Sequence, residues 1–367
     1  MRIAYVLNSL GMGGAERHTI ALAEWMVSRG HTVLLISLLP HQTEQWSTQL
    51  EVVYLDLRKS PASLLLGILR ARRFLRAFHP DLVHSHTFPA NLFARLLRVL
   101  APPQVVVCTM HNVYQGGWMR MLAYRLTDFL AIRTTAVSDA VARRAIEVKA
   151  VPARKCIVLT NAIDTTQFAP DASRRHATRA AHAANSDFIW LAAGRIVSAK
   201  GFLNLLEAFA QVWVVYPQTQ LWIAGEHPRP KSLRTAYTGL VVPKGTTERI
   251  HQLGLSHSML SLYDAADAYV LPSAWEGMPL VIGEAMAMEK PVVATDVGGV
   301  HKFLGDAGTL VPPRDPDTLA QAMLNVMRYS SELRGALGCA ARQRVETYFD
   351  TRILFPKWEI FYQSLVA

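Results

Sequence analysis

The sequence of 367 residues has only three cysteines, which stand far apart at Cys108, Cys156 and Cys339. They form no Cys-x-x-Cys pair and no even-numbered set, which excludes a disulfide framework and is typical of a reducing compartment. Internal repeats of solenoid length and low-complexity tracts are also absent. Repetitive and fibrous architectures are therefore excluded.

Long hydrophobic runs are absent as well. No run approaches the roughly 18 apolar residues that a membrane span needs, and the apolar stretch Leu64–Leu69 is followed directly by Arg70. The segment Met1–Leu7 is typical of a buried strand and lacks the apolar core and cleavage site of a signal peptide. We therefore expect a cytoplasmic protein.

Acidic residues are scarce in the first half of the chain. Residues 1–165 carry 19 Lys and Arg against 10 Asp and Glu, whereas the remainder carries 19 against 18. A basic half can face nucleic acid, an anionic membrane or a phosphate-bearing substrate, and it is also compatible with an ordinary surface rich in arginine. We expect no nucleic acid partner, because no binding module is recognisable and aromatic residues are not interleaved with the charges.

The remaining composition is that of a folded protein. Hydrophobic residues make up 51% and charged residues 18%, and the length fits two domains better than one. The first fifty residues predict a strand over Ile3–Leu7, a glycine-rich loop, a helix over Ala15–Arg29 and a strand over Thr32–Leu38. This is a βαβ unit, whose right-handed crossover makes the sheet parallel.

The same alternation continues along the chain. Further strands are predicted at Asp81–Ser85, Val105–Met110, Thr134–Val137, Phe188–Gly194, Leu221–Ala224, Ala268–Pro272 and Pro291–Thr295. We expect an α/β fold of two Rossmann-like, doubly wound parallel-sheet domains that face a central cleft. The expected boundaries are an N-terminal domain over 1–168, a linker over 169–187, a C-terminal domain over 188–345 and a C-terminal helix over 346–367 that packs back on the N-terminal domain.

A glycine-rich loop, Gly11–Glu16, lies between the first strand and the first helix. Glycines such as Gly13 and Gly14 let backbone N–H groups approach a phosphate at a helix N-terminus. The loop does not match the dinucleotide pattern G-x-G-x-x-G, because Glu16 stands where the third glycine is needed, and no Walker pattern fits. An oxidoreductase is therefore disfavoured, and the glycines fit a simple tight turn equally well.

Two cations follow a predicted strand of the second half. Arg195 ends the segment Ala192–Arg195, and Lys200 precedes Gly201 at the start of the next predicted helix. Cations at the carboxyl edge of a parallel sheet, beside a helix N-terminus, are suited to a pyrophosphate. Solvated surface charge is the alternative interpretation.

Two carboxylates follow another strand end. Glu276 lies in a loop, and Glu284 lies about one turn into the helix that Pro279 starts, with seven residues between the two acids. Carboxylates accept pairs of hydrogen bonds from the vicinal diols of ribose and hexose. Favourable charge near a helix N-terminus is the plainer explanation of Glu284.

These residues resemble the E-x7-E region of the GT-B glycosyltransferases, specifically the large retaining group called family 4, or group 1. The resemblance covers most of the chain. Its motifs, in order, are Gly13–Arg17, Ala136–Ser138, Asn161–Asp164, Gly194–Arg195 with Lys200–Gly201, Leu262–Asp267 through Glu276 and Glu284, Val292–Thr295 with Gly298–Gly299, and Leu310–Pro313.

The resemblance implies roles for individual residues. Arg195 and Lys200 would bind the nucleotide diphosphate, Glu284 the ribose, and Glu276 the transferred sugar. Gly14 would supply a backbone N–H near the phosphates. The full set implied for donor binding is Gly13, Gly14, Arg195, Lys200, Glu276, Gly277, Met278, Pro279, Leu280 and Glu284, and the catalytic set is His111, Arg195, Lys200 and Glu276.

Three histidines of the first half, His84, His86 and His111, lie in or directly after predicted strands. His111 resembles the family's cleft histidine beside the donor sugar, although a histidine that closes a strand is often only structural. His84 and His86 lie on one face of a strand and could ligate a metal. No Cys or carboxylate cluster supports a metal, so we expect no metal and no cofactor, and we interpret His84 and His86 as structural.

The sequence departs from the family pattern in places. Gly225-Glu-His-Pro228 stands where the family has Gly-x-Gly-Pro, Ala162 replaces a usual glycine, and residues 229–249 carry only a weak hydrophobic pattern. None of these departures changes Arg195, Lys200, Glu276 or Glu284.

Basic residues mark the acceptor side that the resemblance assigns to the first domain. Eight Lys and Arg but one acid, Asp81, lie between Arg58 and Arg98, interleaved with leucines and phenylalanines. Such a helix can lie on an anionic membrane, or it can pack its apolar face into the domain. We favour a protein at the inner face of the membrane.

The sequence thus predicts a metal-independent, retaining glycosyltransferase that uses a UDP- or GDP-sugar. The expected acceptor is a glycan or lipid-linked glycan in surface polysaccharide biosynthesis. Alternatives are another GT-B enzyme, such as a sugar-nucleotide epimerase or a phosphorylase, and a non-catalytic scaffold that binds sugar nucleotide or membrane.

Overall fold

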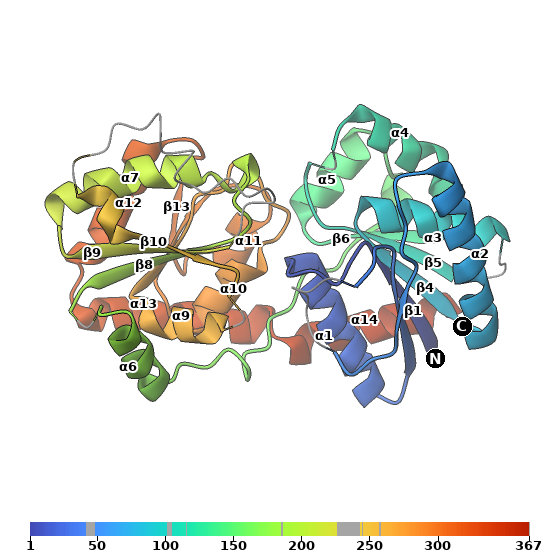
Figure 1. Cartoon of the computed structure of the whole chain (residues 1–367), viewed down its shortest axis with the longest axis horizontal. Helices are drawn as coiled ribbons and strands as arrows, with labels where there is room; N and C mark the ends of the chain where they lie inside the picture. The colour runs from blue at the N-terminus through green and yellow to red at the C-terminus, as the bar shows by residue number, and fades with distance from the viewer. Residues whose placement is uncertain are drawn as a thin grey trace. The chain divides into compact units, whose positions relative to one another are not determined.

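The computed structural model describes residues 1–41, 48–100, 105–114, 116–184, 186–225, 243, 245–256 and 258–366. The chain divides into two compact units (Figure 1). The first unit contains residues Met1–Ala162 and Arg352–Ala367, and the second contains Ile163–Thr351.

The first unit is built on a seven-stranded sheet in the order β3-β2-β1-β4-β5-β6-β7, with parallel pairing throughout. Its strands are β1 (Arg2–Leu7), β2 (Thr32–Ser37), β3 (Val52–Tyr54), β4 (Leu82–His86), β5 (Val105–Met110), β6 (Arg133–Ala136) and β7 (Cys156–Val158). Its helices are α1 (Gly14–Ser28), α2 (Pro61–Phe78), α3 (Phe88–Leu100), α4 (Trp118–Leu126), α5 (Asp139–Glu147) and α14 (Thr351–Val366).

Alternate residues of β1 face opposite layers of this unit. Ala4 and Val6 belong to a core cluster that α2 and α3 cover, whereas Tyr5 hydrogen-bonds to Tyr362 of α14 on the other face. This alternation follows from the period of two in a strand. The sheet is buried on both faces, as a doubly wound parallel sheet requires.

The second unit is built on a six-stranded parallel sheet in the order β10-β9-β8-β11-β12-β13. Its strands are β8 (Phe188–Ala193), β9 (Thr219–Ala224), β10 (Ile250–Gly254), β11 (Ala268–Leu271), β12 (Val292–Thr295) and β13 (Thr309–Val311). Its helices are α6 (Ala172–Ala181), α7 (Phe202–Val215), α9 (Met259–Ala265), α10 (Leu280–Ala287), α11 (Val300–Leu304), α12 (Pro316–Arg328) and α13 (Ser331–Tyr348).

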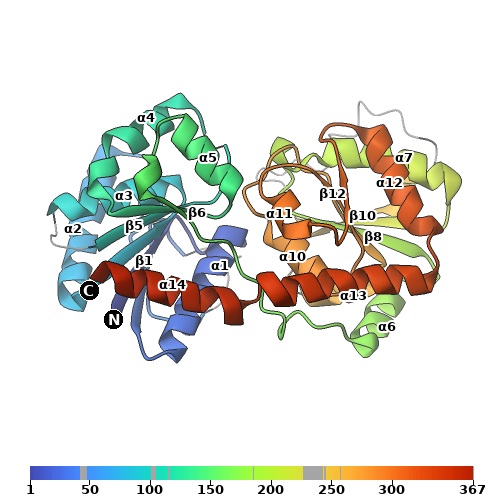
Figure 2. The ribbon, with the colours of Figure 1, turned by 180° about the vertical axis from the view of Figure 1, so that it is seen from behind.

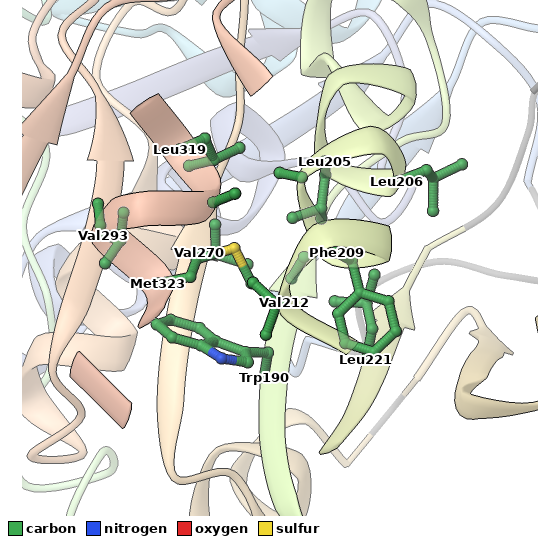
Figure 3. Close-up of a cluster of buried hydrophobic side chains, with 14 of the residues drawn as sticks. Trp190, Leu205, Leu206, Phe209, Val212, Leu221, Val270, Val293, Leu319 and Met323 are labelled. Atoms are coloured by element: carbon green, nitrogen blue, oxygen red, sulfur yellow. The ribbon is translucent and has the colours of Figure 1, made fainter. Parts of the chain in front are cut away.

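One core cluster of this unit lies between the sheet and two helices. Figure 3 shows Trp190 of β8 beside Val212 of α7 and Met323 of α12. Full burial of each such side chain is worth about 1.5–3 kcal/mol. The core therefore fixes β8 and α7, the two elements between which the loop with Arg195 and Lys200 lies.

Two parallel sheets with helices between their strands confirm the predicted α/β fold class. The domain boundaries differ from the prediction. Residues 169–187 were expected to form a linker, yet they contain α6 and belong to the second unit. Asp171 caps this helix by accepting from the backbone N–H groups of Ser173 and Arg174. Arginines of this segment bind acids of the second unit, as Arg179 binds Asp267 at 3.1 Å.

The C-terminal part of the chain is two helices rather than one segment starting at 346. Helix α13 ends at Tyr348, and α14 begins at Thr351 (Figure 2). Residues from Arg352 onward belong to the first unit. The expectations for Glu226–Pro228, and for residues 229–242 and 244, fall outside the described residues.

Candidate functional site

Lys200 and Glu276 form an ion pair beyond the carboxyl ends of β8 and β11. Lys200 Nζ lies 2.6 Å from Glu276 Oε1, and the Ser273 hydroxyl donates to the same oxygen at 2.6 Å. The Glu276 side chain is 7% exposed and that of Lys200 is 20% exposed. The ion pair is therefore mostly shielded from water. In such an environment charge-assisted hydrogen bonds are stronger than at an exposed surface.

Two glycines permit close backbone contacts between the loops that carry Lys200 and Glu276. Gly201 has φ +60°, and a Cβ there would lie 2.0 Å from the Pro272 carbonyl oxygen. Gly298 has φ +57°, and a Cβ there would lie 1.9 Å from the carbonyl oxygen of Glu276 itself. Only glycine fits such backbone approaches at positive φ. Loops from three strand ends are thus locked around one carboxylate.

Glu284 lies in the middle of α10 and is 3% exposed. The Tyr263 hydroxyl donates to Glu284 Oε2 at 2.9 Å. A carboxylate has about four lone-pair sites, so this bond alone does not exhaust its acceptor capacity. The bond to Tyr263 therefore fixes the position of the Glu284 carboxylate.

Tyr269 of β11 interacts electrostatically with both Glu276 and Glu284. Its hydroxyl donates to the Ala193 carbonyl oxygen at the end of β8. Burial raises the pKa of this phenol well above its ordinary value, and the charges of Glu284 and Glu276 raise it further. The Tyr269 phenol is therefore neutral at pH 7.

Arg195 differs from these residues because its side chain is exposed. Within the described part of the chain its guanidinium has no side-chain or backbone partner. Gly277, Met278, Pro279 and Leu280 are buried and connect Glu276 to α10. The second unit thus brings Lys200, Glu276 and Glu284 to one edge of the sheet and leaves Arg195 available to an anion.

The glycine loop of the first unit ends at Gly13, the N-cap residue of α1. A Cβ at Gly13 would lie 2.2 Å from Glu16 Oε2, so the Glu16 carboxylate lies over this turn. An acid at a helix N-terminus is favourable. A phosphate near Gly13 and Gly14 would therefore require the Glu16 side chain to turn away, and their donor-binding role stays a prediction.

His84 is buried in the first unit and has both ring nitrogens engaged. Nδ1 lies 2.6 Å from the Tyr362 hydroxyl of α14, and Nε2 lies 2.6 Å from Thr109 Oγ1 of β5. The ring also lies against Trp358, with centroids 5.1 Å apart. His84 thus joins β4 to the C-terminal helix.

His86 and His111 share a hydrogen bond. His86 Nδ1 lies 2.9 Å from His111 Nε2, while His86 Nε2 is buried with no partner among the described residues. His18 of α1 is buried with both ring nitrogens unpartnered in the described part of the unit. Burial lowers the pKa of His18 to about 4 and that of His111 to about 3. Burial also lowers the pKa values of His84 and His86 well below the ordinary value.

The histidine cluster, defined as His18, His84, His86 and His111, is therefore neutral at pH 7. Among the described residues no group of three or more His, Cys, Asp or Glu side chains is placed to hold a metal ion. None of the described helices is long and apolar enough to cross a membrane.

Sequence reasoning missed several of these contacts. It singled out Lys200, Glu276 and Glu284 but not their pairing or the Tyr263 bond, because 76 residues separate Lys200 from Glu276. It interpreted His86 as structural, and no local pattern signals the His86–His111 bond. The apolar and aromatic residues of α14 were the signal for a packed helix, but not for its Tyr362–His84 contact.

The chain was also compared with known proteins. Residues 12–167 match the family described as Glycosyltransferase Family 4, and residues 187–328 match the family described as Glycosyl transferases group 1. The alpha-D-kanosaminyltransferase of Streptomyces kanamyceticus is 30% identical over 284 residues, 71% of each protein.

A second relative and a solved structure extend this similarity. The UDP-Gal:alpha-D-GlcNAc-diphosphoundecaprenol alpha-1,3-galactosyltransferase of Escherichia coli is 24% identical, over 71% of this chain and 70% of the relative. The crystal structure of HepE of Anabaena in complex with UDP-glucose superposes with a TM-score of 0.86 at 21% identity, covering 99% of this chain and 100% of that chain. At this identity the likeness shows a shared fold.

Proposed function

The chain belongs to the group 1, family 4 glycosyltransferases of the GT-B fold, and from this premise we propose that it is a retaining enzyme that transfers a sugar from a UDP- or GDP-sugar to a glycan or lipid-linked glycan. The observation that carries the donor assignment is the assembly of Lys200, Glu276 and Glu284 at one edge of the second sheet. Cations and diol-binding carboxylates within one site are the groups that a nucleotide sugar needs.

Lys200 is proposed to serve two partners at once. An ammonium group has three N–H donors, and the bond to Glu276 uses one of them. Phosphate oxygens of the donor would take the others, while Glu276 accepts from hydroxyls of the transferred sugar. The ion pair would thereby connect the leaving group to the sugar that it leaves.

Arg195 is proposed to complete the diphosphate site. Its exposed guanidinium can form two parallel bonds to phosphate oxygens. Negative charge on the diphosphate grows as the glycosidic bond breaks, and fixed cations stabilise that charge in the transition state. We propose front-face substitution, in which the departing diphosphate helps to deprotonate the acceptor hydroxyl. No residue is assigned as a nucleophile, and no metal ion is required.

The names of relatives support a sugar acceptor carried on lipid. The Escherichia coli relative is named for UDP-Gal and a diphosphoundecaprenol-linked acceptor, and another, from Staphylococcus aureus, is named for capsular polysaccharide biosynthesis. We place the acceptor on the first unit and the protein at the inner face of a membrane.

Two exposed apolar surfaces of the first unit could support a membrane contact. Helix α2 buries Ile68, Ala71 and Leu75 but leaves Leu65 57% and Leu66 67% exposed. The α2 helix therefore packs on one face, and the leucines exposed on another face support the proposal of a membrane contact.

The second of these surfaces lies on α4 and just beyond it. Trp118, Met119 and Phe129 are 74%, 69% and 72% exposed. Arg120 and Arg125 are exposed on the same helix. Exposed aromatic residues beside arginines are suited to the interface of an anionic bilayer.

The proposal is tested by thermal stabilisation against a panel of nucleotides and nucleotide sugars without added metal. A specific rise in Tm with one UDP- or GDP-sugar is expected for the native chain, and its loss is expected in Glu284→Ala. The matched control is Glu207→Ala, which removes an exposed glutamate from α7. Release of a sugar phosphate or an epimer instead of transfer would favour the phosphorylase or epimerase alternatives.

A further inference from the structure

The hydrogen bond between His86 and His111 has two forms, because each ring is neutral and carries one N–H. In the first form His86 Nδ1–H donates to His111 Nε2. In the second form His111 Nε2–H donates to His86 Nδ1. The 2.9 Å separation is compatible with either. What differs is the proton left on the far nitrogen of each ring.

The surroundings of His86 distinguish the two forms. His86 is 0% exposed, and its Nε2 has no partner among the described residues. The ring lies against His84, with centroids 4.1 Å apart, and near Tyr5. In the second form His86 Nε2 would carry a hydrogen with no acceptor, whereas in the first form it is only an unused lone pair.

A buried N–H without an acceptor is less well tolerated than a buried nitrogen lone pair without a donor. Among buried backbone groups, orphaned N–H donors are rarer than under-satisfied acceptors, and an unsatisfied buried donor loses its full hydration. The same preference applied to imidazole favours the form in which His86 donates. His84 cannot relieve His86 Nε2, because its nitrogens bond to Tyr362 and Thr109.

We propose that His86 is a positioning residue that holds His111 as the Nδ1–H tautomer, so that His111 acts on the substrate as a hydrogen-bond donor and not as a proton-accepting base. His111 follows β5 and is the member of the pair that keeps partial exposure. Its Nε2 is occupied by His86, and its Nδ1–H is the group left to meet an oxygen of the donor or acceptor. This inference rests on the proposed function for its substrate, but not for its tautomer.

The groups around His111 agree with this role. The His86 ring of β4 lies 5.2 Å from the His111 ring, measured between centroids. His18 of α1 and His84 of β4 interact electrostatically with His111, and all three are neutral at pH 7 for the reason given above. A general base works best with a pKa near the operating pH. Burial instead lowers the pKa of His111 to about 3, which makes it a weak base and leaves its donor capacity intact.

The first arm of the test is spectroscopic and needs no substrate. The protein is labelled with ¹⁵N-histidine, and the His111 signals are assigned with His111→Gln. We expect a pyrrole-type Nδ1 and a pyridine-type Nε2 in the native chain, the same pattern in His86→Asn, whose amide N–H replaces Nδ1–H, and mixed tautomers in His86→Leu. A pyrrole-type Nε2 at His111 in the native chain overturns the proposal.

The second arm is kinetic, with the nucleotide sugar found by the thermal panel. His86→Leu is expected to lower kcat about tenfold with little change in KM, and His86→Asn is expected to restore most of the loss. The matched control is His84→Asn, because His84 is as buried as His86 but has no hydrogen bond to His111. This variant should leave the His111 signals unchanged. Equal losses in His86→Asn and His86→Leu, or an acid limb in kcat that disappears in His111→Gln, would overturn the donor role. Absence of any sugar transfer by the native chain would defeat the proposed function while leaving the tautomer assignment standing on the spectrum.

Discussion

The two units place polar groups at the carboxyl edge of a parallel sheet in opposite ways. In the second unit the groups are charged, and the ion pair of Lys200 with Glu276 is held at 2.6 Å by neighbouring loops. In the first unit the groups are neutral histidines, whose rings contact one another and the aromatic rings of α14 in tilted arrangements. The same architecture therefore supports a charged edge and an uncharged one.

The difference follows from what surrounds each edge. Glu276 receives bonds from an ammonium group and a hydroxyl, which compensate for its burial. His18 and His86 have ring nitrogens without partners among the described residues, so a proton there would be an uncompensated buried charge. A charged edge suits the diphosphate of a donor, and a neutral edge suits hydroxyl groups.

The largest expected effect that tests this comparison is the acid sensitivity of the first unit. An unfolded histidine binds a proton near pH 6.5, whereas His18 in the folded chain does so only near pH 4. Because the unfolded state binds more protons in this window, stability is fully present above pH 6.5 and is lost as the pH falls. A single histidine contributes a slope of at most about 1.4 kcal/mol per pH unit. The lowered pKa values of His84, His86 and His111 add to the slope of His18 in the same direction.

Urea unfolding at pH 7, 6 and 5 measures this slope. His18→Leu should lower the slope by the contribution of one histidine proton. The substitution is suited to this test because His18 has no hydrogen-bond partner among the described residues, so no such bond is lost. A slope unchanged by His18→Leu would mean that this ring titrates normally.

The next effect concerns the charged edge. Arg195→Ala should weaken donor binding roughly 10- to 100-fold, because it removes charge-assisted hydrogen bonds worth about 1.5–3 kcal/mol. Its unfolding free energy should stay within about 0.5 kcal/mol of the native value, since the side chain is exposed. Titration of the nucleotide sugar measures the first quantity and urea unfolding the second. A variant that binds donor as well as the native chain would remove Arg195 from the site.

A third effect separates loop geometry from charge. Gly201→Ala should destabilise the second unit by about 1–3 kcal/mol, because a Cβ would collide with the Pro272 carbonyl at positive φ. Gly335→Ala in α13 is the matched control, since a Cβ there meets nothing within 4 Å. It should instead stabilise the chain by about 0.5–1 kcal/mol. Thermal unfolding of both variants checks the pair of signs, and destabilisation of equal size in both would contradict the account.

The smallest effect distinguishes the two exposed surfaces of the first unit. Trp118→Ser with Phe129→Ser should lower co-sedimentation with anionic phospholipid vesicles several-fold, since partial burial of the two rings together contributes on the order of 1 kcal/mol. Leu65→Ser with Leu66→Ser is the matched change on α2. Greater loss in the α2 pair would move the membrane contact to the surface predicted from sequence, and no binding of the native chain to vesicles would defeat both.

The sequence predicted the strands that carry the site because buried parallel strands are short apolar runs, as at Phe188–Ala193 and Val105–Met110. It did not predict β3, β7, β10 and β13, which are the edge strands of the two sheets and are mostly only partly buried, so that their hydrophobic signal is weak. It identified Glu276 and Glu284 by type and spacing. It could not identify Tyr263 or the glycine contact at Gly298, because these depend on distances between chain segments that only the fold creates.

The measurement that tests the central claim most directly is calorimetric titration with the nucleotide sugar and with its free nucleoside diphosphate. Glu284→Ala should weaken both ligands about 100-fold, since two hydrogen bonds to a charged group contribute roughly 3 kcal/mol and ribose is common to both. Glu276→Ala should weaken the nucleotide sugar but leave the free diphosphate unchanged or tighter, because Lys200 loses its carboxylate partner. If Glu276→Ala weakens both ligands equally, or if Glu284→Ala weakens neither, the proposed donor site is wrong.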